Sequence, residues 1–319
     1  MSKLRKTSFF AKSVALAACT ISVLAMTGLK AHATWTGSYV NYDTAITPLI
    51  SSQVVYNNVQ YTFAVNSNSN IRYSTYNGTV RSVGLSVPNN AVTYAAINPV
   101  VYSNKLYLFI TDTAGHISYT TYNGVSWSIY VSVPNNGLTP YLISTSSVVY
   151  GNQLYLFLIG TDGHVYLTKF NGVSWTTYSA VPDNGLTNTN VTTVTTANAL
   201  YLFLVGTNGQ PYLTVFNGTT WSGYGAVPPA AVTHAAVSAT VYNGAIQLFL
   251  VGTDGHIYYS STGAIVIGGS NNVPWTGYTE VPGSGYTFNN VPVSSSVFNN
   301  KVYVDLLSTT NLIYETYQY

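Results

Sequence analysis

Short apolar stretches separated by turn signals follow one another along the chain from residue 34 onward. In one clear copy, the alternation of apolar and polar residues predicts β-strands over residues 147–150, 154–160, 164–170 and 175–181. Gly-Asn, Asp-Gly and Asn-Gly pairs stand between these strands, and such pairs close tight hairpins. Pro182 ends the fourth strand, because proline cannot donate to a β-ladder. A helical period is absent, so the pattern predicts an all-β chain of antiparallel strands.

This four-strand unit is repeated along the chain. An aromatic residue closes the first strand of most copies, at intervals of 46 to 56 residues: Tyr56, Tyr102, Tyr150, Tyr242 and Phe298, with Thr196 in one copy. A tryptophan opens the fourth strand of most copies: Trp35, Trp127, Trp175, Trp221 and Trp275, with Arg81 in one copy. Four short antiparallel strands per unit of this length are typical of a β-propeller blade. Six copies predict a six-bladed β-propeller.

The order of the strands is offset at the two ends of the chain. The pattern begins with a fourth strand over residues 35–40 and ends on a third strand over residues 312–319. We therefore expect the N-terminal strand to complete the last blade, which closes the ring and removes its free edges.

The first residues have the layout of a secretory signal peptide. A basic start, which contains Lys3, Arg5 and Lys6, precedes an apolar run over residues 13–29 and the small-x-small sequence 31–33. We expect cleavage after Ala33, a single propeller domain over residues 34–319, and a secreted protein that is extracellular or on the cell surface. An alternative is that Cys19, which follows Leu-Ala-Ala, is lipidated instead.

Charge and cysteine content change once this segment is removed. The whole chain has 10 Lys and Arg against 8 Asp and Glu, a formal charge of +2. Five of the basic residues precede residue 34, so the remainder carries 5 − 8 = −3 and no cysteine. A nucleic-acid partner is not expected, because the basic excess is missing, and no later segment is apolar enough to span a membrane. With only 6% charged residues, we expect uncharged ligands.

The motif hydrophobic-G-T-D-G-H-x-Y, followed by N-G-x-x-W-x-x-Y-x-x-V-P, is clearest over residues 159–182. It resembles the repeat of bacterial propeller lectins of the Photorhabdus lectin type, and the likeness covers Trp35 to Tyr319. The sequence departs from that family in its six blades, where seven are typical, and in Tyr130, Tyr178, Tyr224 and Tyr278 at positions that often hold a second Trp. Six-bladed fungal fucose lectins are similar in size, but their acid and Arg sugar clamps have no matching positions. The resemblance implies a glycan-binding protein.

The turns between second and third strands hold the first set of candidate residues. In a propeller these turns share one face with the links between blades. The set comprises His116, His164, His256, Asp162 and Asp254. Histidine and carboxylate side chains suit the hydroxyl groups of a sugar, which both donate and accept. The alternative is that Asp-Gly only forms the turn and that histidine only opens the third strand.

Aromatic residues of the fourth strand form the second set of candidate residues: Trp127, Trp175, Trp221, Trp275, Tyr178 and Tyr224. Each tyrosine lies three residues after a tryptophan, so the two point to opposite faces of a regular strand. One exposed aromatic plane could stack on a sugar. The alternative for the tryptophans is packing between blades. A site built on the tryptophan should fail in the copy that has Arg81.

Asp305 is the odd member of the second strands, since the other copies have Phe63, Phe109, Phe157, Phe203 and Phe249. A buried, unpaired acid would be costly, so we expect Asp305 to face the central channel or to pair with Lys301.

Catalytic patterns are missing from the sequence. The eight acids form no obvious glycosidase pair, and the histidines lack metal-ligand spacing. We therefore expect no enzyme, no cofactor and no metal site. The sequence predicts a lectin with several shallow glycan sites, and homo-oligomers are possible. The alternative is a structural or adhesive extracellular protein that uses the propeller for self-assembly or protein contact.

Overall fold

The computed structural model describes Trp35 and residues 51–89, 91–183, 185–263, 272–283, 286–309 and 312–318. All of these belong to one compact unit, Thr34–Tyr319. The expected signal peptide, Cys19 and residues 36–40 of the expected first strand lie outside the described residues.

The described strands form six antiparallel sheets, called blades 1 to 6 in chain order. Blade 1 contains β1 (Ser52–Tyr56), β2 (Val59–Val65), β3 (Ile71–Tyr76) and β4 (Arg81–Ser86). Blade 2 contains β5 (Asn98–Tyr102), β6 (Lys105–Thr111), β7 (Ile117–Tyr122) and β8 (Val131–Ser132). Blade 3 contains β9 (Ser146–Tyr150), β10 (Gln153–Ile159), β11 (Val165–Phe170) and β12 (Ser179–Ala180). Blade 4 contains β13 (Thr192–Thr195), β14 (Leu200–Val205), β15 (Pro211–Phe216) and β16 (Gly225–Ala226). Blade 5 contains β17 (Ser238–Tyr242), β18 (Ala245–Val251), β19 (Ile257–Ser261) and β20 (Thr279–Glu280). Blade 6 contains β21 (Ser294–Phe298), β22 (Lys301–Leu307) and β23 (Ile313–Gln318).

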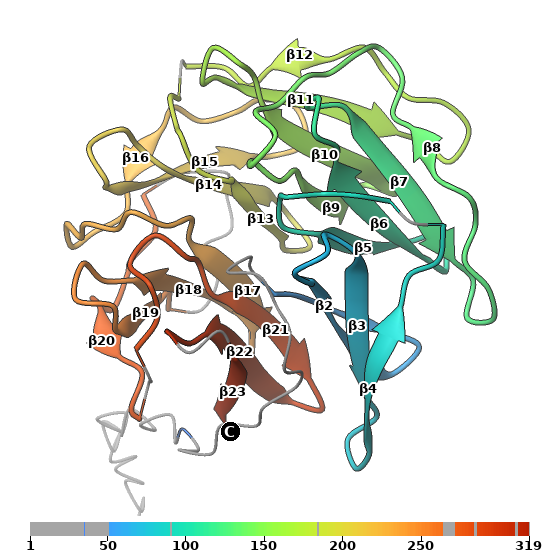
Figure 1. The fold of residues 1–319 in the computed structure, drawn as a ribbon. Helices are drawn as coiled ribbons and strands as arrows, with labels where there is room; N and C mark the ends of the chain where they lie inside the picture. Colours follow the sequence, from blue (N-terminus) through green and yellow to red (C-terminus); the bar gives the residue numbers. More distant parts are fainter. Residues whose placement is uncertain are drawn as a thin grey trace, which may run out of the picture. The chain divides into compact units, whose positions relative to one another are not determined.

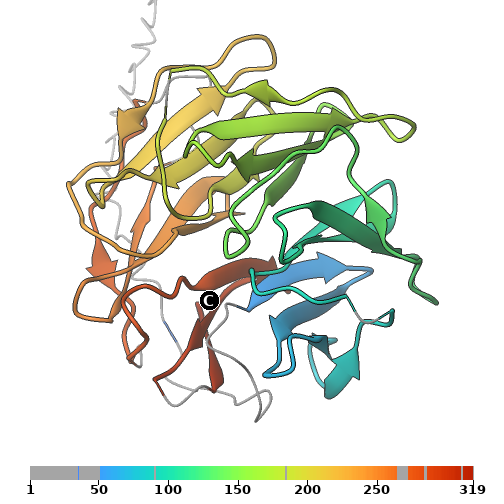
Figure 2. The same ribbon diagram turned by 45° about the horizontal axis from the view of Figure 1, so that its top comes forward.

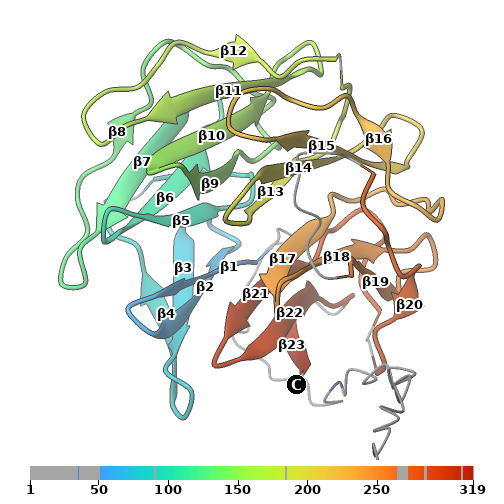
Figure 3. The same cartoon turned by 180° about the vertical axis from the view of Figure 1, so that it is seen from behind.

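The blades form a ring around their first strands (Figures 1 and 3). Each first strand contacts the first strand of the next blade, and β21 contacts β1. Figure 2 shows blade 6, in red, beside blade 1, in blue. The first strands line a central channel of about 180 Å³, whose polar side chains are Ser, Thr, Asn and Gln. The six-bladed, all-β propeller predicted from the repeat is confirmed.

Trp35 supplies the fourth position of blade 6. Its backbone pairs antiparallel with Gln318 of β23. Its ring meets Phe249 of blade 5 edge-on, with 6.1 Å between centroids. Trp35 therefore lies where the offset of the repeat places the start of the fourth strand of the last blade.

The fourth strands of blades 2 to 5 are shorter than predicted, with two residues each, whereas β4 of blade 1 has six. In blade 3, Trp175 bridges Phe170, and regular pairing resumes only over β12. Between these points the Thr168 hydroxyl donates to the Thr176 carbonyl at 2.7 Å, and the Lys169 amide donates to the Thr176 hydroxyl at 3.0 Å. Side chains thus replace part of the ladder, which a pattern of apolar alternation does not reveal.

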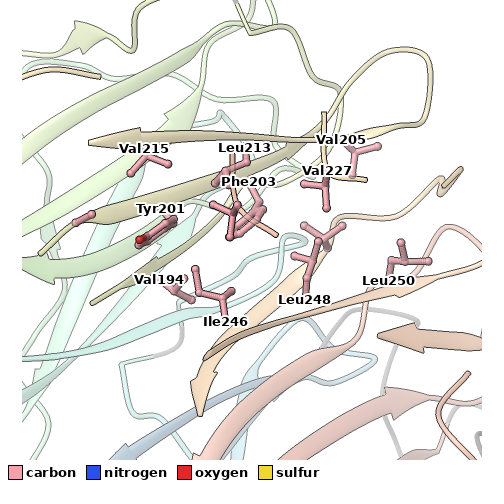
Figure 4. Packing of buried hydrophobic residues seen from close by; sticks show 13 residues of the cluster. Val194, Tyr201, Phe203, Val205, Leu213, Val215, Val227, Ile246, Leu248 and Leu250 are labelled. Atoms are coloured by element: carbon pink, nitrogen blue, oxygen red, sulfur yellow. The ribbon is translucent and has the colours of Figure 1, made fainter. Parts of the chain in front are cut away.

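Apolar residues pack between neighbouring blades rather than in one central core. Figure 4 shows the junction of blades 4 and 5, where Tyr201 and Phe203 lie with Ile246 and Leu248. The tryptophans belong to these junctions, because each meets the β2-type phenylalanine of the preceding blade edge-on. The pairs are Phe63–Trp127, Phe109–Trp175, Phe157–Trp221, Phe203–Trp275 and Phe249–Trp35.

The junction of blades 6 and 1 replaces this aromatic contact by charged groups. Asp305 stands at the phenylalanine position and Arg81 at the tryptophan position. Asp305 is completely buried and lies opposite Glu315 in the β22–β23 register. Arg81 donates to the Glu315 carboxylate at 3.0 Å. Both expectations for Asp305 were therefore wrong: its side chain is sealed from the channel, and its charged neighbours are Glu315 and Arg81.

Asp305 makes the stability of the ring depend on pH. Burial is the main cause that raises the pKa of Asp305 well above its usual 3.8, and the negative charge of the neighbouring Glu315 is the second cause. The positive charge of Arg81 acts in the opposite direction. The pKa of such an acid is higher in the folded protein than in the unfolded chain, so protonation favours the folded state. The stabilisation is fully present when the pH is below the pKa of the unfolded chain. It is lost as the pH rises through the pKa of the folded protein.

We expect Asp305→Asn to remove this contribution to the pH dependence. The wild-type free energy of unfolding should fall, relative to that of Asp305→Asn, as pH rises above about 3.8. Urea unfolding of both proteins over a pH series measures the difference. A wild-type-to-variant difference that stays constant with pH would contradict the prediction.

Candidate functional site

Three similar pockets lie at consecutive blade junctions. Each is bounded by the link that enters a blade and by the turn between the second and third strands of that blade. Pocket 2–3, of about 270 Å³, lies between residues 135–138 and residues 160–162. Pocket 3–4, of about 300 Å³, and pocket 4–5, of about 340 Å³, repeat the arrangement. The links and these turns therefore share one face, as the propeller connectivity predicts.

An acid or amide paired with a tyrosine forms one wall of each pocket. In pocket 2–3, the Asp162 carboxylate accepts from the His164 backbone N–H at 3.1 Å and from the Tyr166 hydroxyl at 2.8 Å. Asp254 in pocket 4–5 accepts in the same way from the His256 backbone N–H and from Tyr258, at 3.1 and 2.8 Å. In pocket 3–4 the equivalent pair is Asn208 and Tyr212.

These hydrogen bonds shift the ionisation of the paired groups. The hydrogen bond from the His164 backbone N–H is the largest cause that lowers the pKa of Asp162, and the bond from the Tyr166 hydroxyl is the second. The same bond to Asp162 raises the pKa of Tyr166. Pocket 2–3 therefore presents an ionised carboxylate beside a neutral tyrosine at neutral pH.

The glycine that opens the turn motif makes room for the pair. A Cβ atom on Gly160 would lie 2.5 Å from Asp162 Oδ1 and 2.7 Å from the Tyr166 ring. Gly252 has the same close contacts, at 2.5 Å from Asp254 Oδ1 and 2.8 Å from the Tyr258 ring. Any larger residue would displace the tyrosine from the pocket wall, which explains the Gly in the repeated Gly-Thr-Asp-Gly sequence.

A second tyrosine lines each pocket from the fourth segment of the blade: Tyr178, Tyr224 and Tyr278. Burial raises the pKa of each of these hydroxyls. In pocket 3–4 the link passes directly over this ring, since a Cβ on Gly185 would lie 2.5 Å from Tyr224 Cζ. The hydroxyls are enclosed, and no described residue accepts a hydrogen bond from them.

The candidate residues from the sequence separate into two groups. Asp162, Asp254, Tyr178 and Tyr224 line the three pockets. The three histidines do not line them. His116 Nδ1 lies 3.5 Å from Asp112 on the surface, and His256 Nδ1 lies 3.1 Å from Glu280.

The tryptophan candidates pack inside the blade junctions. Trp175 is half-buried, and its ring stacks on Phe170 at 4.9 Å and meets Phe109 at 6.0 Å. Trp127, Trp221 and Trp275 occupy equivalent places, and none of the four lines the three pockets. Their position corresponds to the packing alternative of the sequence analysis.

Sequence reasoning missed Tyr166, Tyr212 and Tyr258, although the signal was present. Each stands four residues after the turn acid or amide, inside the repeated motif. Blade 2 lacks this pair, because Ala114 and Ser118 occupy the positions of Asp162 and Tyr166. Its turn is instead organised by Asp112, which accepts from the backbone N–H groups of Ala114 and His116.

Among the described residues, no group of three His, Cys, Asp or Glu side chains is placed to hold a metal ion. The described part of the chain also contains no helix long and apolar enough to cross a membrane.

No family model and no curated protein matches the chain. Solved structures with the same fold do match. The BP39L lectin from Burkholderia pseudomallei aligns with a TM-score of 0.66 at 18% identity, over 84% of this chain and 79% of that one. The fucose-recognising six-bladed lectin of Aleuria aurantia aligns with a TM-score of 0.60 at 12% identity, over 83% and 89%. The SapL1 lectin, solved with α-methyl fucoside, aligns with a TM-score of 0.64 at 13% identity, over 86% and 94%. At these identities the likeness shows the propeller fold.

Proposed function

We propose that this protein is a secreted lectin that binds neutral sugars in pockets 2–3, 3–4 and 4–5. The observation that carries the proposal is the threefold repetition of one polar arrangement: an acid or amide, a tyrosine hydroxyl and a second tyrosine, all at a blade junction. Packing alone does not require an exposed acid or amide bonded to a tyrosine at the same place in three blades.

The chemistry of the pockets suits a sugar. Asp162 Oδ1 and Oδ2 have lone pairs left after their two internal hydrogen bonds, so they can accept from vicinal hydroxyls. The Tyr166 and Tyr178 rings add apolar surface for the C–H groups. Shallow sites of this kind are individually weak, and three on one face would act together through avidity.

The structural neighbours support the sugar ligand. Two of the three aligned lectins are described as recognising or binding fucose or its methyl glycoside, which makes fucosides the first sugars to test. The closer relation to lectins of the Photorhabdus type, secretion after cleavage at Ala33 and a homo-oligomeric state stay predictions.

We expect the double variant Asp162→Ala/Asp254→Ala to lose at least tenfold in avidity on a glycan array, because two of three sites lose their carboxylate. Asp112→Ala is the matched control, since it removes a turn acid that lines none of the three pockets. The control should bind like the wild type. Absence of binding to any sugar by the dense wild-type protein would refute the proposal. Fixed assemblies that free sugar does not dissolve would favour the adhesive alternative.

A further inference from the structure

The three pockets each carry one carboxylate on the link or the turn, but not at the same place. In pocket 2–3 the link has Asn135 and the turn has Asp162. In pocket 3–4 the two groups are exchanged, with Asp183 on the link and Asn208 on the turn. Pocket 4–5 has Pro229 on the link and Asp254 on the turn. The pockets are therefore similar in shape and different in hydrogen-bonding character.

The exchange reverses the hydrogen bond at the turn. Asn208 Oδ1 accepts from the Gln210 backbone N–H at 3.1 Å, which fixes the orientation of the amide. Asn208 Nδ2 must then face the tyrosine, and it donates to the Tyr212 hydroxyl oxygen at 3.0 Å. In pockets 2–3 and 4–5 the tyrosine hydroxyl donates its proton to the aspartate. Only in pocket 3–4 is the tyrosine proton available to a ligand.

The exchange also changes the link. Asn135 Nδ2 donates to the Thr176 carbonyl at 3.1 Å, so this amide ties the link to the fourth segment of blade 3. Asp183 stands at the same position before blade 4 but has no proton to donate in its ionised form. Burial is the main cause of the raised pKa of Tyr224 in the same pocket, and the negative charge of Asp183 is the second cause. Pocket 3–4 therefore combines a hydroxyl donor on Tyr212 with a carboxylate acceptor on Asp183.

The pocket has a hydrogen-bond donor on one wall and an acceptor on another. These suit a ligand group that holds an acceptor and a donor of its own in a fixed arrangement. An acetamido group has a carbonyl that only accepts and an N–H that only donates. Leu186 and Leu204 also line pocket 3–4 and offer apolar surface to the methyl group. The turn side chains of pockets 2–3 and 4–5 offer acceptors, which instead suit hydroxyl groups that donate.

We propose that pocket 3–4 is a distinct subsite for an N-acetylated sugar, in which Tyr212 donates to the acetamido carbonyl and Asp183 accepts from its N–H. Pockets 2–3 and 4–5 bind sugars through donating hydroxyls. This inference rests on the proposed lectin function and adds a ligand class for one pocket.

The test compares two matched sugar pairs, N-acetylglucosamine with glucose and N-acetylgalactosamine with galactose, by titration calorimetry on the compact unit Thr34–Tyr319. The wild type should bind at least one N-acetylated sugar at one site per chain. Asn208→Asp should weaken that binding about tenfold, because it turns the tyrosine proton back toward the carboxylate. Asp112→Asn is the matched control, because Asp112 is a turn acid that lines none of the three pockets, and it should leave the affinity for the N-acetylated sugar within twofold.

Both substitutions are isosteric and exposed, so an unchanged melting temperature verifies the fold. Unchanged affinity of Asn208→Asp for the N-acetylated sugar would overturn the inference. Binding of other sugars without any N-acetylated one would overturn it too and leave the lectin proposal intact. Absence of all sugar binding on the glycan array would instead refute the proposed function itself.

Discussion

Arg81→Ala is expected to lower the free energy of unfolding at pH 7 by about 3–5 kcal/mol, since removal of the arginine leaves the buried Glu315 carboxylate without its counter-charge. Asp305 is fully enclosed and Glu315 nearly so, and Arg81 donates to Glu315 at 3.0 Å. The loss falls at the junction of blades 6 and 1, where the ring closes. Urea unfolding followed by tryptophan fluorescence measures it.

Arg72→Ala is the control for this prediction. Arg72 lies in the same blade and bonds the Gly84 carbonyl and the Ser86 hydroxyl near the surface, at 2.6 and 2.9 Å. Removal of the Arg72 side chain should lower the free energy of unfolding by no more than about 1 kcal/mol. A stability of Arg81→Ala equal to that of Arg72→Ala would show that the charged junction does not support ring closure.

Trp175→Ala should lower the free energy of unfolding by about 3 kcal/mol, because it opens a cavity between blades 2 and 3. The Trp175 ring contacts Phe170, Phe109 and Tyr119, with centroids 4.9, 6.0 and 6.1 Å apart. Differential scanning calorimetry should show a lower Tm. Sugar binding measured well below that Tm should persist, because the indole does not line pocket 2–3.

His164→Ala provides the comparison. Its side chain does not line pocket 2–3, and its backbone N–H, which the substitution keeps, donates to Asp162. We expect a stability change within about 0.5 kcal/mol. If Trp175→Ala kept its Tm and lost sugar binding instead, the indole would be a stacking platform for the ligand and the packing assignment would be wrong.

The fold was predictable because its signals are local and repeated. The Asp-Gly and Asn-Gly turns, the alternation in strands such as β10 and the spacing of the tryptophans each report on a short segment. Six copies of one local pattern leave few architectures, and the offset of Trp35 against β23 implied how the ring closes. The fourth strand of blade 3 was overestimated because the hydroxyl of Thr168 replaces ladder bonds there.

The candidate site was predictable only in part. The turn acids Asp162 and Asp254 and the tyrosines Tyr178 and Tyr224 were found from chemistry and repetition. Tyr166 was overlooked, although it follows Asp162 by four residues. Whether a histidine or its neighbouring acid lines a pocket depends on how the link from the preceding blade crosses the turn, which spacing along the chain does not determine.

The sequence by itself determined the unit, the number of blades and the offset by which the N-terminal segment completes the last one, because hydrogen-bonded hairpins and apolar alternation are local properties. Only the tertiary structure showed that Asp305 and Arg81, two separate departures from the repeat, are the two sides of one junction. They are 305 − 81 = 224 residues apart in the chain and meet because the ring brings its two ends together. A similar reason holds for the pockets, because each is enclosed between a link and the blade that the link enters, and so exists only once the link has folded over the turn of that blade.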